Sequence, residues 1–333
     1  MSNFFGRAVR NSILTVTFLY ILLIFPFPTR IDWSHFSDTE TVYPQLLPYV
    51  RESFVPVRDA VLHLNEVGNP KGDKLMILIH GFLATGLVEW KHLMLHLANN
   101  TQYRIVAPDL RGFNTSSKSE DVMVSNWGQS ILDMEELISV LGYPNATFIA
   151  HNGGSLVAYQ VAIKFPEKVD RLVILNGFHP SSYSENADFE QLLKSYYVFL
   201  YQVPFIEYRV RSNNFAWFVS SLTDSNPKSF SKEDVERLLE AWSQPLALES
   251  MLNHYRKFFV KKQAETPHTP TTVQAPTLIV FGARDPYLKV QFGMDAVGFC
   301  VHPESRAVLI PEASHYTPHD VPDQINSLID QFL

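Results

Sequence analysis

The chain has 333 residues, of which 46% are hydrophobic and 13% aromatic, a composition that is typical of globular domains and excludes disordered and fibrous proteins. Its formal net charge of -7 at pH 7 offers no basic surface to phosphate groups, so nucleic acid is not expected as a partner. The single cysteine, Cys300, excludes an internal disulfide, and the twelve histidines show no metal-ligand spacing with it. We therefore expect one large folded unit without a structural metal or a cofactor.

The first segment of the chain differs from the rest. Arg7 and Arg10 precede an almost unbroken apolar run over residues 13–25. With its flanking residues this run has roughly 16 residues, between the core of a signal peptide and the roughly 20 residues of a full membrane span. No small-residue cleavage motif follows it, which favours a retained single-pass anchor over a cleaved signal peptide. The expected N-terminal segments are a tail (1–12), a membrane anchor (13–29) and a polar linker (30–52).

The orientation of this anchor stays open, although we expect it in the endoplasmic-reticulum membrane. The two leading arginines favour a cytoplasmic N-terminus and a luminal domain, but Arg30 follows closely and reduces the bias. Glycosylation sequons would be modified only in a luminal domain, so they test the topology without establishing it. These sequons begin at Asn99, Asn114 and Asn145.

Past the linker, segments of strand and helix character alternate. This alternation predicts a mostly parallel sheet with helices on both faces. Continuous apolar runs are typical of strands that are buried on both faces. The expected strands cover residues 61–64, 75–79, 104–107, 148–150, 172–175, 278–281 and 307–310, and the clearest helices cover 131–141 and 156–165.

One long segment, residues 180–265, interrupts the alternation. It contains no buried-strand pattern, and it is helical in character and rich in aromatic residues. We interpret it as a helical lid inserted between two parts of the sheet domain, which then cover residues 53–179 and 266–333. A separate helical domain is the alternative, but strands resume near Pro276 and the final helix is short, which favours an insertion.

The most specific motif is a sharp turn from a strand into a helix, with the sequence His151-Asn152-Gly153-Gly154-Ser155. In open α/β sheets the residues just past the carboxyl ends of strands contact ligands. A nucleophile elbow exposes its reactive residue at such a turn and needs small neighbours, because the strand and helix backbones nearly touch. The apex residue is Asn152, and the N–H group of Gly153 is an expected oxyanion donor.

Three further strands end in candidate catalytic residues. His80-Gly81-Phe82 turns sharply and offers a second oxyanion donor, the N–H group of Phe82. Asp285 and His315 each follow a later strand; taken alone, the first is typical of a helix cap and the second is one histidine among twelve. The chain order of elbow, acid and histidine is the order that elbow-type hydrolases use, and it predicts a catalytic set.

Together these motifs resemble the epoxide-hydrolase branch of the α/β-hydrolases, especially its membrane-anchored members, over nearly the whole chain. The resemblance implies an α/β-hydrolase fold, in which a mostly parallel sheet is flanked by helices and carries an inserted helical lid. In that family an elbow aspartate attacks an epoxide carbon, and a histidine-activated water hydrolyses the resulting ester to the diol. The matching segments are residues 80–82, 109–112, 176, 179–180, 194–204, 243–245, 253–256, 282–285 and 312–315.

The resemblance also implies roles for single residues. Asp285 would orient His315, and His315 would activate the water. The lid tyrosines that hydrogen-bond the epoxide oxygen match Tyr197 and Tyr255, although the neighbouring Tyr196 leaves the first assignment open by one step. A phenol is neutral at physiological pH and still able to donate a proton to the opening ring. The residues expected to contact an apolar substrate are His80, Leu83 and His151.

The chain departs from this family inside the pocket. Asn152 stands in place of the nucleophilic aspartate, Gly153 in place of the tryptophan that usually follows it, and Leu83 in place of a proline. A glutamate and aromatic residues expected over 84–87 are absent. A carboxamide has no negative charge, so Asn152 cannot open an epoxide as a carboxylate does. Loss of the nucleophile of a comparable triad costs on the order of 10⁶ in turnover.

Two classes of function therefore stay open. The first is hydrolysis of apolar lipid or xenobiotic epoxides, which requires conversion of Asn152 to aspartate or direct attack by a water that His315 activates; an Asn-Gly pair is prone to such conversion. The second is a catalytically impaired protein that binds an apolar ligand or a partner. Serine-hydrolase activity is excluded because Ser155 is a packing residue rather than the apex, and haloalkane dehalogenation also needs an apical aspartate.

Overall fold

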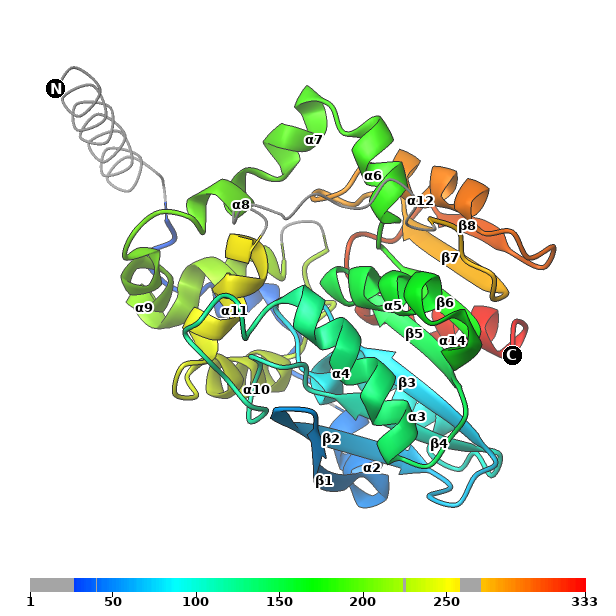
Figure 1. The fold of residues 1–333 in the computed structure, drawn as a ribbon. Helices are drawn as coiled ribbons and strands as arrows, with labels where there is room; N and C mark the ends of the chain where they lie inside the picture. The colour runs from blue at the N-terminus through cyan, green and yellow to red at the C-terminus, as the bar shows by residue number, and fades with distance from the viewer. Residues whose placement is uncertain (1–26, 40, 224–225, 258–270) are drawn as a thin grey trace, which may run out of the picture.

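The computed structural model describes residues 27–39, 41–223, 226–257 and 271–333. At its centre lies one eight-stranded sheet of order β1-β2-β4-β3-β5-β6-β7-β8 (Figure 1). Strand β2 pairs antiparallel with β1 and β4, and the other neighbours pair parallel, which confirms the predicted mostly parallel sheet. The strands are β1 (Arg51–Val57), β2 (Ala60–Gly68), β3 (Lys74–Ile79), β4 (Tyr103–Pro108), β5 (Ala146–His151), β6 (Val169–Leu175), β7 (Thr277–Gly282) and β8 (Arg306–Ile310).

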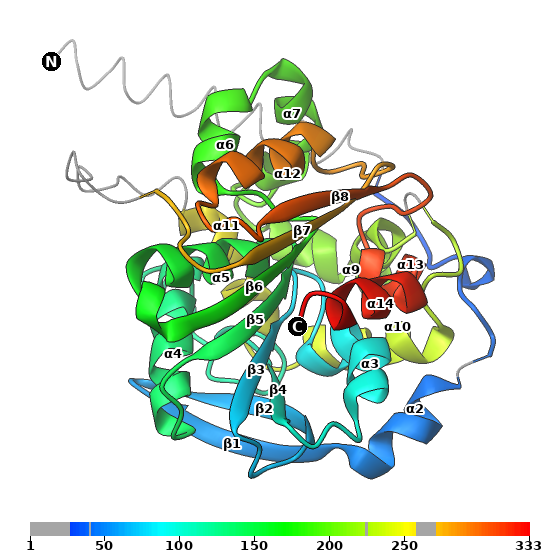
Figure 2. The same cartoon turned by 90° about the vertical axis from the view of Figure 1, so that its right-hand side faces the viewer.

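Helices cover both faces of this sheet, as Figure 2 shows for α4 and α5 on one face and α3 and α14 on the other. The central strands bury both sets of their alternating side chains: in β3, Ile77 joins the core cluster on the α4 side, and Met76 joins the cluster on the α3 side. This double burial explains the continuous apolar runs. The helices around the sheet are α2 (Val42–Leu46), α3 (Gly86–Leu97), α4 (Trp127–Val140), α5 (Gly153–Lys164), α12 (Val290–Ala296), α13 (Thr317–Asp320) and α14 (Pro322–Asp330).

Among the described residues between β6 and β7, the chain forms six α-helices, where the sequence predicts an inserted lid. Residues 258–265, the end of that predicted lid, lie outside the described residues. The interior of the six helices is largely aromatic: Phe218 packs edge-on against Trp242, with ring centroids 5.4 Å apart, and Tyr201 lies against Trp217 at 5.6 Å. Such aromatic pairs stabilise the packing of these helices against one another. The helices are α6 (Pro180–Asn186), α7 (Phe189–Lys194), α8 (Tyr196–Leu200), α9 (Ile206–Ser221), α10 (Lys232–Trp242) and α11 (Ala247–Arg256).

The segment expected to be a linker, residues 30–52, is packed against the lid instead. Phe36 is buried, and Ser37 forms a β-bridge with Ser231 at the start of α10. Tyr43 is also buried and donates a hydrogen bond of 2.7 Å from its hydroxyl to Asp234 Oδ1. The prediction of a linker is therefore wrong for much of this segment, because the burial of these residues depends on tertiary packing that the local sequence does not show.

Most of the expected membrane anchor, together with the tail before it, lies outside the described residues. Within the parts of the chain that are described, no helix is long and apolar enough to cross a membrane. Phe27, near the end of the expected anchor, packs edge-on against Trp217 of α9 with centroids 4.8 Å apart, and the guanidinium of Arg209 lies 4.7 Å from its ring. Phe27 is thus part of the folded unit.

A buried ion pair joins the sheet domain to the lid. Lys91 Nζ of α3 lies 2.7 Å from Asp234 Oδ2 of α10, and both side chains are almost fully buried. Asp234 Oδ2 also accepts a hydrogen bond of 2.8 Å from the N–H group of Ser231. A buried carboxylate of this kind depends on its cation, since the low-polarity surroundings penalise an uncompensated charge.

Replacement Lys91→Met is expected to lower the free energy of unfolding by about 3–5 kcal/mol, because it leaves the carboxylate of Asp234 buried without a cation. Chemical denaturation of the purified protein measures this change. Lys232→Met is the matched control: its partner Asp38 is exposed, so little change is expected. Equal losses of unfolding free energy in the two variants would show that the buried pair stabilises the fold no more than the exposed pair does.

Candidate active site

Asn152 lies at the apex of the turn from β5 into α5. Its backbone angles, φ 50° and ψ −123°, are strained for a residue other than glycine. The turn exists only because two neighbours have no side chain: a Cβ on Gly154 would lie 2.6 Å from the carbonyl oxygen of His80, and a Cβ on Gly81 would lie 2.8 Å from Cβ of Asn152. The structure thus places Asn152 where the sequence motif predicts the apex of an elbow.

The two expected oxyanion donors converge on the carboxamide of this residue. Asn152 Oδ1 accepts a hydrogen bond of 2.5 Å from the N–H group of Gly153 and another of 3.2 Å from that of Phe82. Two donors aimed at one carbonyl oxygen polarise that carbonyl and stabilise negative charge that develops there. The carbonyl now in the hole belongs to residue 152 itself.

His315 contacts the same carboxamide from the other side. Its Nε2 atom accepts a hydrogen bond of 2.7 Å from Asn152 Nδ2, and its Nδ1 atom lies 2.7 Å from Asp285 Oδ2. The carboxylate can only accept, so the imidazole proton sits on Nδ1 and the lone pair of Nε2 faces residue 152. This is the orientation that a general base needs.

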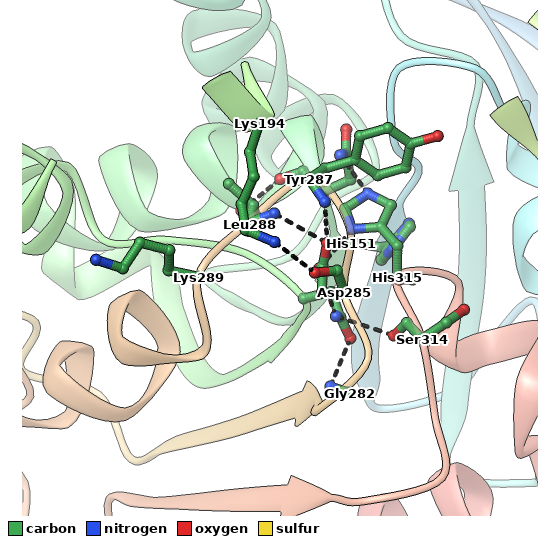
Figure 3. A network of polar contacts seen from close by, with 12 residues as sticks. His151, Lys194, Gly282, Asp285, Tyr287, Leu288, Lys289, Ser314 and His315 are labelled. Atoms are coloured by element: carbon green, nitrogen blue, oxygen red, sulfur yellow. Dashed lines mark hydrogen bonds and ion pairs between the residues drawn. The ribbon is translucent and has the colours of Figure 1, made fainter. Parts of the chain in front are cut away.

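Asp285 is held in place by a network of donors, drawn in Figure 3. Asn176 Nδ2 donates to its Oδ2 atom at 2.7 Å, and the backbone N–H groups of Tyr287 and Leu288 donate to Oδ1 at 2.8 and 2.9 Å. Burial by itself would raise the pKa of Asp285, but His315 and these hydrogen bonds outweigh it and lower the pKa. Asp285 therefore stays ionised and fixes the tautomer of His315.

Above this set lies a cavity of about 40 Å³, space for a few water molecules. Tyr197 of α8 and Tyr255 of α11 line it, with their rings 5.8 Å apart and nearly perpendicular, and their side chains are hydrogen-bonded to each other. Burial raises the pKa of both phenols, so both remain protonated donors at neutral pH. The apolar part of the wall includes Phe82, Leu83 and Trp217.

His80 does not line this cavity, so the prediction that it contacts substrate is wrong. It is fully buried, its Nδ1 atom bonds the carbonyl oxygen of Gly81 at 2.7 Å, and its Nε2 atom accepts from the N–H group of Leu110 at 3.0 Å. Both ring nitrogens thus support the loop that carries Phe82. The other two predicted contact residues, Leu83 and His151, do line the cavity.

The cavity wall also contains a carboxylate that no sequence motif indicated. Glu89 of α3 is buried, and its Oε2 atom lies 3.1 Å from His151 Nδ1. The other nitrogen of His151 donates to the carbonyl oxygen of His315 at 2.8 Å, so a proton is needed between Glu89 and His151. Burial would raise the pKa of Glu89, but His151 dominates and holds this pKa at about 2. The available signal was an acidic residue within the largely apolar helix 86–97.

A variant Glu89→Gln is expected to be less stable than the parent near neutral pH by roughly 3 kcal/mol. The pKa of Glu89 falls from 4.5 to about 2 on folding, so its contribution is present above pH 4.5 and is lost as the pH falls towards 2. Denaturant unfolding at several pH values should show the two proteins converging over this window. Glu236→Gln, at an exposed position, provides the control. A difference in unfolding free energy between parent and variant that stays constant with pH would contradict the ion pair.

Trp127, the first residue of α4, fills the space that a side chain at position 153 would need. A Cβ on Gly153 would lie 2.5 Å from two carbons of the Trp127 indole. The indole also packs edge-on against His254, with centroids 4.4 Å apart, and faces Tyr255 at 6.4 Å. The tryptophan that the family resemblance leads one to expect after the apex is absent, but an indole still packs beside the elbow and comes from another helix.

Gly153→Ala is expected to cost about 1–3 kcal/mol in unfolding free energy, because the new methyl group overpacks against the indole. Adding Trp127→Leu should recover part of that loss, and a double-mutant cycle measures the coupling. Gly298→Ala is a control, since a Cβ there meets nothing within 4 Å. Strictly additive effects of the two changes would mean that Trp127 does not occupy the space beside Gly153.

Among the described residues, no group of three or more histidine, cysteine, aspartate or glutamate side chains is arranged to hold a metal ion. An acid, a base, an oxyanion hole and two phenols surround one strained residue, which is a hydrolytic arrangement.

Comparison with known proteins gives the family. Residues 74–321 match the family model of the α/β hydrolase fold. The chain is 31% identical over 290 residues to epoxide hydrolase 4 of Homo sapiens, covering 84% of this chain and 78% of that protein. It is 29% identical over 318 residues to epoxide hydrolase 2 of Caenorhabditis elegans, covering 91% and 87%.

Solved structures agree at the level of the fold. An epoxide hydrolase from Bacillus megaterium, in complex with an inhibitor, is similar with a TM-score of 0.74 and 24% identity, over 84% of this chain and 99% of that one. Sheet, elbow and family model together define the protein as an α/β-hydrolase. Within that class the chain belongs to the epoxide hydrolase family.

Proposed function

We propose that the pocket binds apolar epoxides and carries the machinery of an epoxide hydrolase, and that ring opening depends on a carboxylate at position 152. The observation that supports this most is the convergence of three groups on that one side chain. Its Oδ1 atom accepts from Gly153 and Phe82, and its Nδ2 atom contacts His315 Nε2 at 2.7 Å. A carboxylate with the same shape would be aimed into the cavity beneath the tyrosines.

With aspartate at the apex, the proposed reaction has two steps. A carboxylate oxygen attacks an epoxide carbon, while the hydrogen-bonded phenols of Tyr197 and Tyr255 supply a proton to the ring oxygen. His315 then takes a proton from a water that attacks the ester carbonyl, whose oxygen lies in the hole formed by the N–H groups of residues 82 and 153. Asp285 stabilises the imidazolium, which protonates the leaving oxygen as the ester C–O bond breaks and the diol leaves. The proton of the acid formed at residue 152 restores the phenol, so the carboxylate is regenerated.

A second candidate function is binding without turnover, and one observation favours it for the encoded sequence. Asn152 Nδ2 donates to His315 Nε2, so the lone pair of the base is already engaged by a neutral group. In that state the carboxamide of Asn152 and the imidazole of His315 satisfy each other, and the aromatic wall remains able to hold an apolar ligand. The protein would then be a binding module that retains an epoxide-hydrolase pocket.

The location of this pocket relative to lipid is a further part of the proposal. The apolar run over residues 13–25, with arginines before it, supports an N-terminal anchor in a membrane, and an apolar substrate would concentrate there. Phe27 packs on lid helix α9, so the anchor would join the folded unit directly at the lid.

The variant Asn152→Asp is expected to form diols from a panel of aryl and lipid epoxides. The parent, verified by mass to carry the amide, should be slower by a factor on the order of 10⁶ because a carboxamide is not a nucleophile. Asn152→Asp combined with His315→Ala should accumulate a covalent ester that mass spectrometry detects, because water is no longer activated. Turnover by a parent with an intact amide would contradict this mechanism. An Asn152→Asp variant that binds epoxides without turnover would favour the binding module.

A further inference from the structure

We infer that the protein hydrolyses the carboxamide of its own Asn152 and so converts this residue to aspartate. The inference rests on the proposed function and names the origin of its nucleophile. A carboxamide is the nitrogen analogue of the ester that the proposed reaction hydrolyses at this same residue. Three groups that would act on the ester already contact the amide: two N–H groups on Oδ1 at 2.5 and 3.2 Å, and the base on Nδ2 at 2.7 Å.

The hydrolysis needs only water and the residues present. A water molecule displaces the Asn152 Nδ2 hydrogen bond from the lone pair of His315 Nε2. It then attacks Cγ of Asn152, and its proton passes to Nε2. The N–H groups of Gly153 and Phe82 hold the negative oxygen of the tetrahedral intermediate. The C–N bond then breaks as Nδ2 takes the proton from His315, and the ammonia that leaves becomes ammonium by taking the proton of the new acid. The sum is carboxamide plus water giving carboxylate plus ammonium.

The same geometry disfavours the ordinary route of Asn-Gly deamidation. In that route the backbone nitrogen of Gly153 attacks Cγ, and the cyclic imide opens to a mixture of aspartate and isoaspartate. Here the N–H group of Gly153 donates to Asn152 Oδ1 and begins helix α5, so the nitrogen is held as a donor to the carbonyl. Hydrolysis through His315 leaves the backbone unchanged and gives aspartate alone.

The chain contains its own control, because its second Asn-Gly pair is Asn176-Gly177. Asn176 also has a positive φ, 42°, and is also buried. Its Nδ2 atom, however, donates to Asp285 Oδ2 and to the carbonyl oxygen of Ser314, and its Oδ1 atom accepts from Gly282. These partners hold the Asn176 amide without activating a water, so it should persist while Asn152 reacts.

The experiment is peptide mapping of the full chain by mass spectrometry, beside His315→Ala and Asp285→Asn variants. Fresh protein is incubated in water enriched in ¹⁸O, and the peptides with residues 152 and 176 are followed in time. The expected result is aspartate at 152 with one ¹⁸O incorporated, no isoaspartate, and an unchanged amide at 176. The His315→Ala variant should convert roughly 100-fold more slowly or not at all. If conversion precedes purification, the parent should carry the acid and His315→Ala the amide.

Three outcomes would overturn the inference: an amide that persists in the parent, equal conversion in His315→Ala, or an aspartate and isoaspartate mixture. The Asp285→Asn variant guards against a folding defect, since it keeps a side chain of the same shape and should also slow conversion. Turnover by Asn152→Asp together with a persistent amide in the parent would leave the proposed function intact and remove this inference. Conversion to aspartate without epoxide turnover would leave this inference intact and remove the proposed function.

Discussion

The close approach of backbones at the elbow is the constraint on which the rest of the site depends. β5 enters the turn and α5 leaves it with Gly154 against the carbonyl oxygen of His80, at a separation that no Cβ permits. This contact forces the strained φ of Asn152 and directs its side chain away from the sheet. It also brings the loop after β3 close enough for Phe82 to donate to that side chain. Without this contact there is no oxyanion hole.

The sheet was predictable because its central strands are buried on both faces, which leaves continuous apolar runs in the sequence. Strand β1 escaped prediction for the opposite reason: it lies at the edge, is half exposed and contains Pro56. The packing of residues 30–52 escaped it too, since Tyr43 is buried by contacts with residues far along the chain, Lys91 of α3 and Asp234 of α10. The local sequence pattern therefore predicts well which residues are buried within the sheet. It predicts poorly which residues are buried by elements that come much later in the chain.

The same division holds in the site. Asn152, Asp285 and His315 follow strand ends, so the parallel sheet brings them together and the chain order indicates them. Glu89 and Trp127 come from the helices α3 and α4, and their distances to the elbow depend on how these helices pack. His80 had the reverse outcome: the motif indicated it as a residue of the pocket, whereas both of its ring nitrogens hydrogen-bond to backbone groups.

The choice between amide and carboxylate at residue 152 changes the charge of the site more than its shape. As encoded, neutral Asn152 donates to the imidazole of His315, whose other nitrogen faces the ionised Asp285. A carboxylate there could only accept, so His315 would have to be protonated or turn its lone pair to water. Binding an apolar ligand requires neither the strained apex nor a buried acid behind the base, and both cost stability. Hydrolysis of a carbonyl group attached to residue 152, ester or amide, requires both.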